Sequence, residues 1–218
     1  MGAGRRAFLL GFGALCGGTA RSAWAKPEAK ALPKVPVAFA VAGRSVVDKA
    51  GKRTVEPVVT RAWIDAQLAQ ANAIFGEHGI GFREAKELAA LDEKMCALED
   101  RSDRDALATE LRGGVINVFF VESLRDVDDP KLHRMGVMWR NLRDLKKKYV
   151  IVAASARETT LAHEIGHYLG NDHSYVKNNL MSYARDGGKV TLNADQAARA
   201  RRTAEAHFAK KDLVASDA

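Results

Sequence analysis

An eleven-residue segment restricts the fold of this chain more than any other feature. It reads His-Glu-Ile-Gly-His-Tyr-Leu-Gly-Asn-Asp-His and runs from His163 to His173. The spacing of four between His163 and His167 places both rings on one face of a helix, one turn apart. A straight helix would carry His173 away from them, so Gly170 is predicted to adopt the left-handed conformation that ends a helix and reverses the chain. The segment therefore predicts a helix, a glycine turn and three converging imidazoles.

This set of side chains suits a zinc ion. Imidazole nitrogens bind Zn²⁺ at roughly 2.0–2.1 Å, and three protein ligands leave a fourth position for water, as in catalytic sites. Glu164 is rotated by about 100° from His163 on the helix, so it can face that water without binding the metal. Zinc lowers the pKa of its water to about 7, and a carboxylate can take the proton. We predict Zn²⁺ bound by His163, His167 and His173, with Glu164 as general base and acid.

Strand patterns elsewhere in the chain predict an α/β (α+β) domain with one mixed sheet. Residues 35–41 alternate between larger and smaller apolar side chains, as in a strand with one large and one small face. Residues 115–121 and 149–154 are apolar and β-branched, which favours buried strands. Shorter strands are predicted at residues 80–84 and 135–140.

Helix signals lie between and after these strands. Thr60 is a predicted N-cap, and the helix that follows it is expected to end near Gly79. Residues 87–112, rich in charge and alanine, predict one or two surface helices. The helix that carries the histidines is expected to begin at the Ser-x-x-Glu pattern of residues 155–158 and to run to Leu169. A similar pattern, Asn193 with Gln196, predicts the start of a C-terminal helix.

The histidine segment and a methionine that follows it carry a family resemblance. Asn179-Leu180-Met181-Ser182-Tyr183 comes shortly after the third histidine. H-E-x-x-H-x-x-G-x-x-H followed by a Met-turn resembles the metzincin zinc metallopeptidases. The resemblance implies a single catalytic domain with a mixed twisted sheet, a long helix, an active-site helix and a C-terminal helix. It also implies that Met181 lies in a hydrophobic floor beneath the metal and that an edge strand, here residues 135–140, pairs with an extended substrate.

Two further residues resemble different branches of that family. Ser174, directly after the third histidine, is similar to the matrixins. Tyr183 is similar to the corresponding tyrosine of astacins and serralysins, which can bind zinc or stabilise the transition state. We expect Tyr183 to assist catalysis at the oxyanion, and a buried structural tyrosine is the alternative. The subfamily stays open.

The N-terminus has the pattern of an export signal. Arg5-Arg6-Ala7-Phe8-Leu9 opens a short apolar stretch, and Ala23-Trp24-Ala25 has the small-x-small form of a cleavage site. We predict a twin-arginine-type signal over residues 1–25, with a plain secretory signal as the alternative. A peptidase domain over residues 26–218 would follow, in the periplasm or outside a bacterial cell.

Charge and cysteine content restrict the partners of the mature chain. Removal of residues 1–25 takes away three arginines and no acids, so the net charge falls from +7 to +4. The basic residues are scattered among acids, which argues against nucleic acid. We expect no membrane contact after signal removal. Only Cys96 remains, so an internal disulfide is not expected, and a buried thiol is.

These observations predict an exported zinc-dependent endopeptidase acting on a protein or peptide substrate. A secreted zinc-binding interaction protein without proteolytic activity is the alternative from another class. The intact Glu164 argues against it, because zinc binding alone needs no carboxylate at that position. A sugar- or amide-directed hydrolase that uses the same water is a third reading. The sequence makes no prediction of the oligomeric state.

Overall fold

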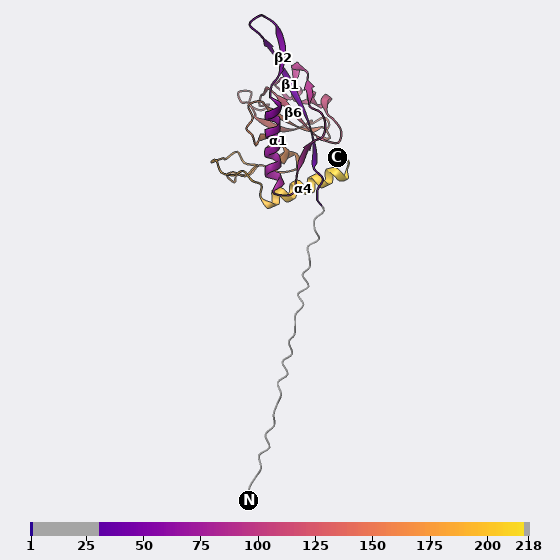
Figure 1. Ribbon diagram of the computed structural model, residues 1–218, viewed down its shortest axis with the longest axis vertical. Coiled ribbons are helices and arrows are strands. Elements are labelled where there is room, and N and C mark those ends of the chain that lie inside the picture. Colours follow the sequence, from indigo (N-terminus) through magenta and orange to yellow (C-terminus); the bar gives the residue numbers. More distant parts are fainter. Residues whose placement is uncertain (2–30, 216–218) are drawn as a thin grey trace. The chain divides into compact units, whose positions relative to one another are not determined.

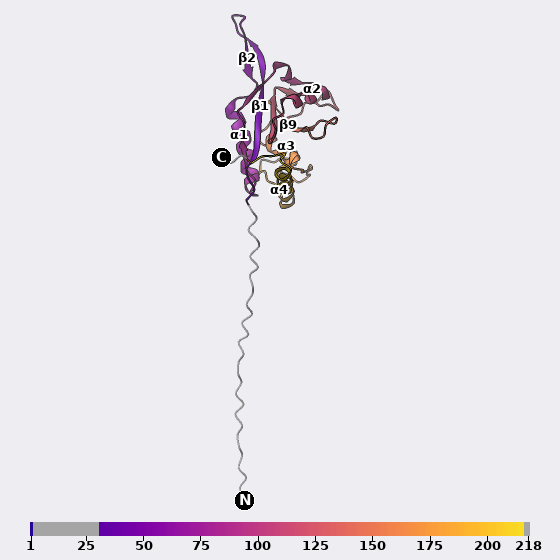
Figure 2. The same ribbon diagram turned by 90° about the vertical axis from the view of Figure 1, so that its right-hand side faces the viewer.

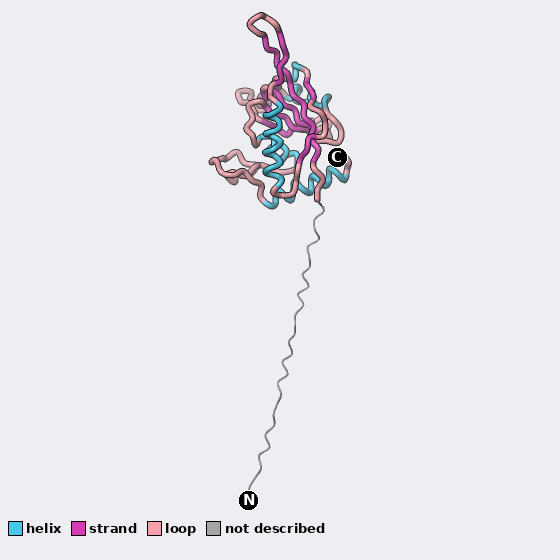
Figure 3. Tube along the Cα trace, viewed as in Figure 1, coloured by secondary structure: helices cyan, strands magenta, loops and turns pink. Residues whose placement is uncertain are grey.

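The computed structural model describes residue 1 and residues 31–215. The chain divides into two units, Met1–Lys30 and Ala31–Ala218. The predicted export signal, residues 1–25, therefore lies outside the described residues except for its first residue. The second unit is a sheet with helices packed against it (Figures 1 and 3). Within the described residues, no helix is long and apolar enough to cross a membrane.

The main sheet has seven strands and both parallel and antiparallel pairs. Its continuous path runs β2-β1-β6-β9-β8, with parallel neighbours in the middle and an antiparallel strand at each end. The strands of this path are β1 (Val35–Val47), β2 (Arg53–Pro57), β6 (Ile116–Val121), β8 (Gly136–Arg140) and β9 (Lys148–Ala153). Strand β8 thus forms one edge, as predicted for residues 135–140.

Four shorter strands complete the sheets. Two of them pair with β1 in parallel, and two form a small separate sheet. They are β3 (Phe82–Glu84), β4 (Ala89–Leu91), β5 (Ala97–Leu98) and β7 (Ser123–Leu124).

The helices are α1 (Arg61–Gly76), α2 (Arg101–Ala106), α3 (Thr160–Tyr168) and α4 (Ala194–Ala209), with 3-10 turns η1 (Glu93–Met95) and η2 (Leu107–Glu110). Two predicted helix starts are confirmed: the Thr60 hydroxyl accepts from the Trp63 N–H, and Asn193 forms a reciprocal capping box with Gln196. The predicted mixed α/β fold with a long helix, a histidine-bearing helix and a C-terminal helix is confirmed.

The alternating pattern of β1 separates two hydrophobic clusters. Its large side chains, such as Phe39, pack with α1 and α3 on one face of the sheet. Its small ones, Ala40 and Ala42, face the segment around residues 91–111. Figure 2 shows α1 and α2 on opposite sides of β1. Because both faces are covered, the predicted strand with one large and one small face is buried on both sides.

The prediction of surface helices over residues 87–112 is largely wrong. The segment forms two short strands, two 3-10 turns and a single helix, α2. Its apolar residues Leu91, Leu98 and Leu107 are buried in the second cluster and hold the chain against the sheet. Alanine and charge favour a helix locally, but tertiary burial of these side chains decides the backbone.

The predicted start of the histidine helix at residues 155–158 is also wrong. Helix α3 begins at Thr160, and its N-cap residue Thr159 makes no side-chain cap bond. Gln67 on α1 caps the helix instead: its Oε1 accepts from the Leu161 N–H at 3.1 Å, and its Nε2 donates to the Arg157 carbonyl at 2.9 Å. A residue distant in sequence thus replaces the local capping pattern.

Candidate metal centre

Helix α3 is fixed by burial on almost every side. Leu161, Ala162 and Ile165 lie in the large hydrophobic cluster, and Gly166 is buried as well. The exposed fraction of His163 is 7% and that of Glu164 is 6%. The two polar side chains therefore have little freedom of their own, and the helix sets their positions.

Gly170 turns the chain at the end of α3, as predicted. Its φ is 88°, a conformation that favours glycine. The Gly170 N–H donates to the His167 carbonyl and the Asn171 N–H to the Gly166 carbonyl, each at 3.0 Å. The helix ends one residue earlier than expected, at Tyr168. This turn returns the chain, so His173 lies beside the helix instead of beyond it.

The three imidazoles meet at their Nε2 atoms. His167 Nε2 lies 3.1 Å from His163 Nε2 and 3.1 Å from His173 Nε2. Nitrogens that bind one zinc ion tetrahedrally at 2.0–2.1 Å are roughly 3.3 Å apart. His163, His167 and His173 could therefore hold a metal ion between them.

The protonation of two rings supports this conclusion. His163 Nδ1 lies 2.7 Å from the Leu180 carbonyl, and His167 Nδ1 lies 2.7 Å from the Asn171 carbonyl. A carbonyl can only accept, so each Nδ1 carries the proton and each Nε2 presents a lone pair. Two lone pairs at 3.1 Å repel each other unless a cation lies between them. The same pattern of carbonyl partners orients histidine ligands in metal sites generally.

Burial keeps both helix histidines neutral. It lowers the pKa of His163 to about 4, against the opposing hydrogen bond to Leu180, and it lowers the pKa of His167 as well. Metal ligands must be deprotonated to bind. The rings are thus ready to act as ligands near neutral pH.

Glu164 is attached to the edge strand. Its Oε2 accepts the Met138 N–H at 2.7 Å, which joins α3 to β8. Burial raises the pKa of this carboxyl to about 7, although the Met138 hydrogen bond and the Arg134 charge act in the opposite direction. A carboxyl with such a pKa can both accept and donate a proton near neutrality.

Gly136 makes room for Glu164, a role that the sequence did not reveal. A Cβ at this position would lie 2.9 Å from Glu164 Cγ and 2.7 Å from Thr160 Cγ2. Any larger residue would push the carboxylate or the helix away from β8. Only the pairing of β8 with α3 in three dimensions exposes this requirement.

The turn that contains Met181 lies directly beneath the helix. Met181 is fully buried, and a Cβ on Gly166 would come within 2.5 Å of its Sδ. The Met181 carbonyl accepts from the Ser174 N–H at 2.8 Å, and the Asn179 side chain accepts from the Met181 N–H at 2.9 Å. The turn thereby fixes the chain next to His173 and supplies the Leu180 carbonyl that orients His163.

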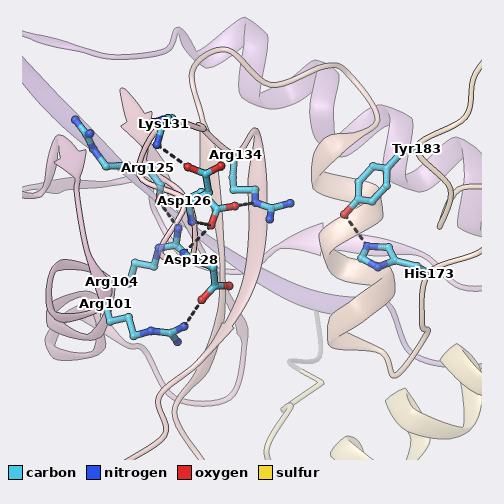
Figure 4. Close-up of polar contacts among 10 residues, drawn as sticks. Arg101, Arg104, Arg125, Asp126, Asp128, Lys131, Arg134, His173 and Tyr183 are labelled. Carbon is cyan, nitrogen blue, oxygen red and sulfur yellow. Dashed lines mark hydrogen bonds and ion pairs between the residues drawn. The ribbon is translucent and has the colours of Figure 1, made fainter.

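Tyr183 extends from this turn to the histidines. Its hydroxyl lies 2.7 Å from His173 Nε2. Figure 4 shows the two side chains pointing toward each other. The exposed fraction of Tyr183 is 69%, so the alternative of a buried structural tyrosine is wrong. The hydroxyl can reach either an ion held by the imidazoles or a substrate beside it.

A network of arginines and aspartates forms a wall opposite the tyrosine (Figure 4). Asp126 accepts from the backbone N–H groups of Asp128 and Asp129 at 2.8 and 3.1 Å and forms an ion pair with Arg134. Arg104, only 2% exposed, donates to the Arg125 carbonyl. The arginine partners come from separate segments, Arg101 and Arg104 from α2 and Arg134 from the loop before β8, so no local sequence pattern indicates this network.

Two cavities meet at the histidines. The first, of about 300 Å³, lies between the loop before α3 and the turn after Met181; the second, of about 360 Å³, extends along β8 towards Trp139. Gly136, Glu164 and Tyr183 line both cavities, which continue to either side of the site.

Of the remaining predictions, the burial of Cys96 is confirmed, and burial raises the pKa of its thiol to about 11.

No protein-family model matches the chain, and no curated protein matches it. Among solved structures, the chain is similar to metalloproteinase-II from Bacteroides fragilis, at 17% sequence identity and a TM-score of 0.49. The match covers 82% of this chain and 55% of that chain, so the protein spans about half the length of this neighbour.

Proposed function

We propose that this protein is an exported zinc-dependent endopeptidase, with His163, His167 and His173 as the ligands. The observation that carries the proposal is the position of His167 Nε2, 3.1 Å from the Nε2 atoms of both His163 and His173, with two of the rings oriented by backbone carbonyls. Zinc held there would supply a Lewis acid and an activated water. The intact Glu164 beside these rings favours catalysis over a purely structural site.

Glu164 serves as the proton carrier. It would accept a proton from the attacking water and then donate it to the amine that leaves when the peptide bond breaks. Its hydrogen bond to the Met138 N–H holds one carboxylate oxygen on β8, which leaves Oε1 for the proton. The raised pKa of about 7 suits both halves of this transfer.

Strand β8 and Tyr183 would contact the substrate. Among the described strands β8 pairs only with β9, so its other edge can receive an extended peptide by strand addition. The exposed Tyr183 hydroxyl can donate a hydrogen bond to the oxygen that gains negative charge as the carbonyl is attacked. A role for Tyr183 as a further metal ligand is the alternative, and metal affinity of Tyr183→Phe distinguishes the two.

The decisive experiment uses the mature chain, residues 26–218, loaded with zinc and given an unbiased peptide library read by mass spectrometry. We expect cleavage that a chelator stops and zinc restores. Glu164→Ala should lose about 10²- to 10⁴-fold in rate and keep its zinc. Glu158→Ala, an exposed carboxylate just before the same helix, is the matched control and should keep full activity.

Two outcomes would overturn the proposal. Cleavage that survives Glu164→Ala would reject the mechanism. A wild-type protein that binds zinc and cleaves no protein or peptide would favour the non-catalytic interaction protein instead.

The proposal that the protein is exported depends on the sequence of residues 1–25 alone. We propose that the paired arginines Arg5 and Arg6 direct the folded protein across the membrane through the twin-arginine route. Replacing both with lysine should retain the protein inside the cell, and fractionation of expressing bacteria measures this. Unchanged export would favour the plain secretory signal.

A further inference from the structure

The cavity between α3 and the turn after Met181 is strongly cationic. It lies directly beside the candidate metal ligands, since His163, Glu164 and Tyr183 form one of its walls. Three arginines line it: Arg134, Arg157 and Arg185. Among the described residues that line the cavity, Glu164 is the only carboxylate, and its Oε2 already accepts the hydrogen bond of the Met138 N–H.

Two of these arginines have no carboxylate partner. Arg134 forms an ion pair with Asp126. Within residues 31–215, neither Arg157 nor Arg185 forms an ion pair with an aspartate or glutamate. Burial lowers the pKa of Arg185, and the nearby positive charge of Arg157 lowers it further. Two like charges thus lie near each other at one end of the cavity, an arrangement that an anion would stabilise.

Arg185 is held rigidly in this position. Its guanidinium donates to the Asn179 carbonyl at 2.8 Å and to the Ala184 and Leu180 carbonyls at 3.2 Å each. These neutral partners fix the group and leave its charge unbalanced. Arg157 is exposed at the cavity wall, in the loop between β9 and α3. One fixed and one adjustable guanidinium can bind a carboxylate from two directions.

The size and remaining lining of the cavity agree with a short acidic group. Its volume of about 300 Å³ is at the lower end for ligand pockets and suits a single side chain. Thr159, Thr160 and Ser182 add hydroxyls to the wall. An aliphatic side chain would desolvate these polar groups without replacing their hydrogen bonds, which disfavours it.

We propose that this cavity binds a substrate carboxylate immediately beside the scissile bond, so that the protein cleaves next to aspartate or glutamate. The inference rests on the proposed function and names the substrate class of the same site. Arg157 and Arg185 determine the specificity. The carboxylate can come from an acidic side chain or from the C-terminus of a short peptide, and the two sources require separate measurements.

The test compares matched peptides taken from a cleaved library sequence. One pair has Asp or Asn at the position beside the cleaved bond, in peptides with amidated C-termini. We expect wild-type kcat/KM to favour Asp roughly tenfold or more, as for a hydrogen bond to a charged group. A second pair, free acid against amide at a nearby C-terminus, reports the other source of the carboxylate.

Arg157→Gln should reduce the ratio of kcat/KM for the Asp peptide to kcat/KM for the Asn peptide several-fold. Arg157→Glu should reverse the preference, so that kcat/KM for the Asp peptide falls below kcat/KM for the Asn peptide. Arg202→Gln, an exposed arginine on α4, is the matched control and should retain the wild-type preference. Equal rates for all matched peptides with wild type, or equal loss of preference in Arg202→Gln, would overturn the inference.

A binding measurement separates this inference from the proposed function. Zinc-loaded Glu164→Ala is titrated with the same Asp and Asn peptides, and we expect tighter binding of Asp that depends on Arg157. If the protein cleaves peptides without preferring acidic residues and binds the Asp and Asn peptides equally, the carboxylate site is refuted and the proposed peptidase function still holds. Selective binding by a wild type that cleaves no peptide refutes the peptidase and leaves the carboxylate site.

Discussion

The candidate metal centre has two halves that are built in different ways. Helix α3 supplies His163, Glu164 and His167 from regular backbone packed into the hydrophobic cluster. Residues 171–185 supply His173, Met181 and Tyr183 from a segment without helix or strand. The regular spacing of the helix sets the positions of its side chains. In the turn, individual hydrogen bonds set them, such as the one from the Met181 N–H to the Asn179 side chain.

The halves are also joined directly. The Leu180 carbonyl of the turn accepts from His163 Nδ1 of the helix, and the Ser174 N–H donates to the Met181 carbonyl. The turn therefore orients a ligand that it does not carry. This difference predicts that damage to either half weakens the metal site, but by different routes and to different degrees.

Removal of a ligand should have the largest effect. His167→Ala and His173→Ala should each lower zinc affinity by about 1,000-fold, since each removes one of three ligands. Competition with a chromophoric chelator measures the change, and His207→Ala on α4 is the control imidazole. A much smaller loss for His173→Ala than for His167→Ala would show that the turn half does not hold its ligand in place before zinc binds.

Contact between the halves gives the next largest effect. In Gly166→Ala the new Cβ would lie 2.5 Å from Met181 Sδ, so the helix or the turn must move. We expect the free energy of unfolding to fall by about 2 kcal/mol, because overpacking outweighs the helix propensity gained from alanine. Chemical denaturation measures it. Gly113→Ala, which meets nothing within 4 Å, is the control, and equal stability of both variants would contradict the packing described.

Loss of a hydrogen bond within the turn should have a smaller effect. Asn179 is 5% exposed, accepts from the Met181 N–H and forms reciprocal bonds with Gln196. Asn179→Ala should destabilise the fold by about 1.5 kcal/mol and lower zinc affinity by about tenfold through the displaced turn. Gln196→Ala keeps the Met181 contact and should lose less. If both variants keep wild-type zinc affinity, the turn does not support the ligands.

The smallest effect concerns the loop across the cleft from the turn. Hydrogen bonds from the backbone of Asp128 and Asp129, together with Arg134, lower the pKa of Asp126 to about 2. The pKa of Asp126 in the folded protein is below the ordinary aspartate value of 3.8, so the stabilisation is fully present above about pH 4 and is lost as pH falls through 2. Asp126→Asn should flatten the pH dependence of unfolding in that window, and Asp195→Asn should not. Identical curves for Asp126→Asn and wild type would contradict these contacts.

Sequence patterns predicted the helix half of the site better than the turn half. The four-residue spacing of His163 and His167 and the left-handed Gly170 follow from local geometry, and both hold in the structure. The strand at residues 35–41 was predicted because its alternation is local too. In the turn half, the sequence indicated Met181 and Tyr183 only through the family resemblance.

The features that the sequence missed depend on contacts between distant segments. Gln67 replaces the local cap of α3, and Gly136 makes room for Glu164. Arg157 and Arg185 come from separate loops and meet only at the cavity wall. Residues 87–112 contain helix-forming amino acids whose backbone is decided by burial of Leu98 and Leu107. No local pattern contains that information.

X-ray absorption at the zinc edge identifies the ligands of the metal, when it is recorded on the mature, zinc-loaded chain together with elemental analysis of the same sample. We expect one zinc per chain, three imidazole nitrogens at about 2.0–2.1 Å and no sulfur ligand. Loss of one imidazole shell in His173→Ala, and no change in His207→Ala, would identify the ligands. A folded protein that takes up no zinc, or a zinc ion bound by sulfur or by fewer than three imidazoles, would contradict the assignment of His163, His167 and His173 as ligands.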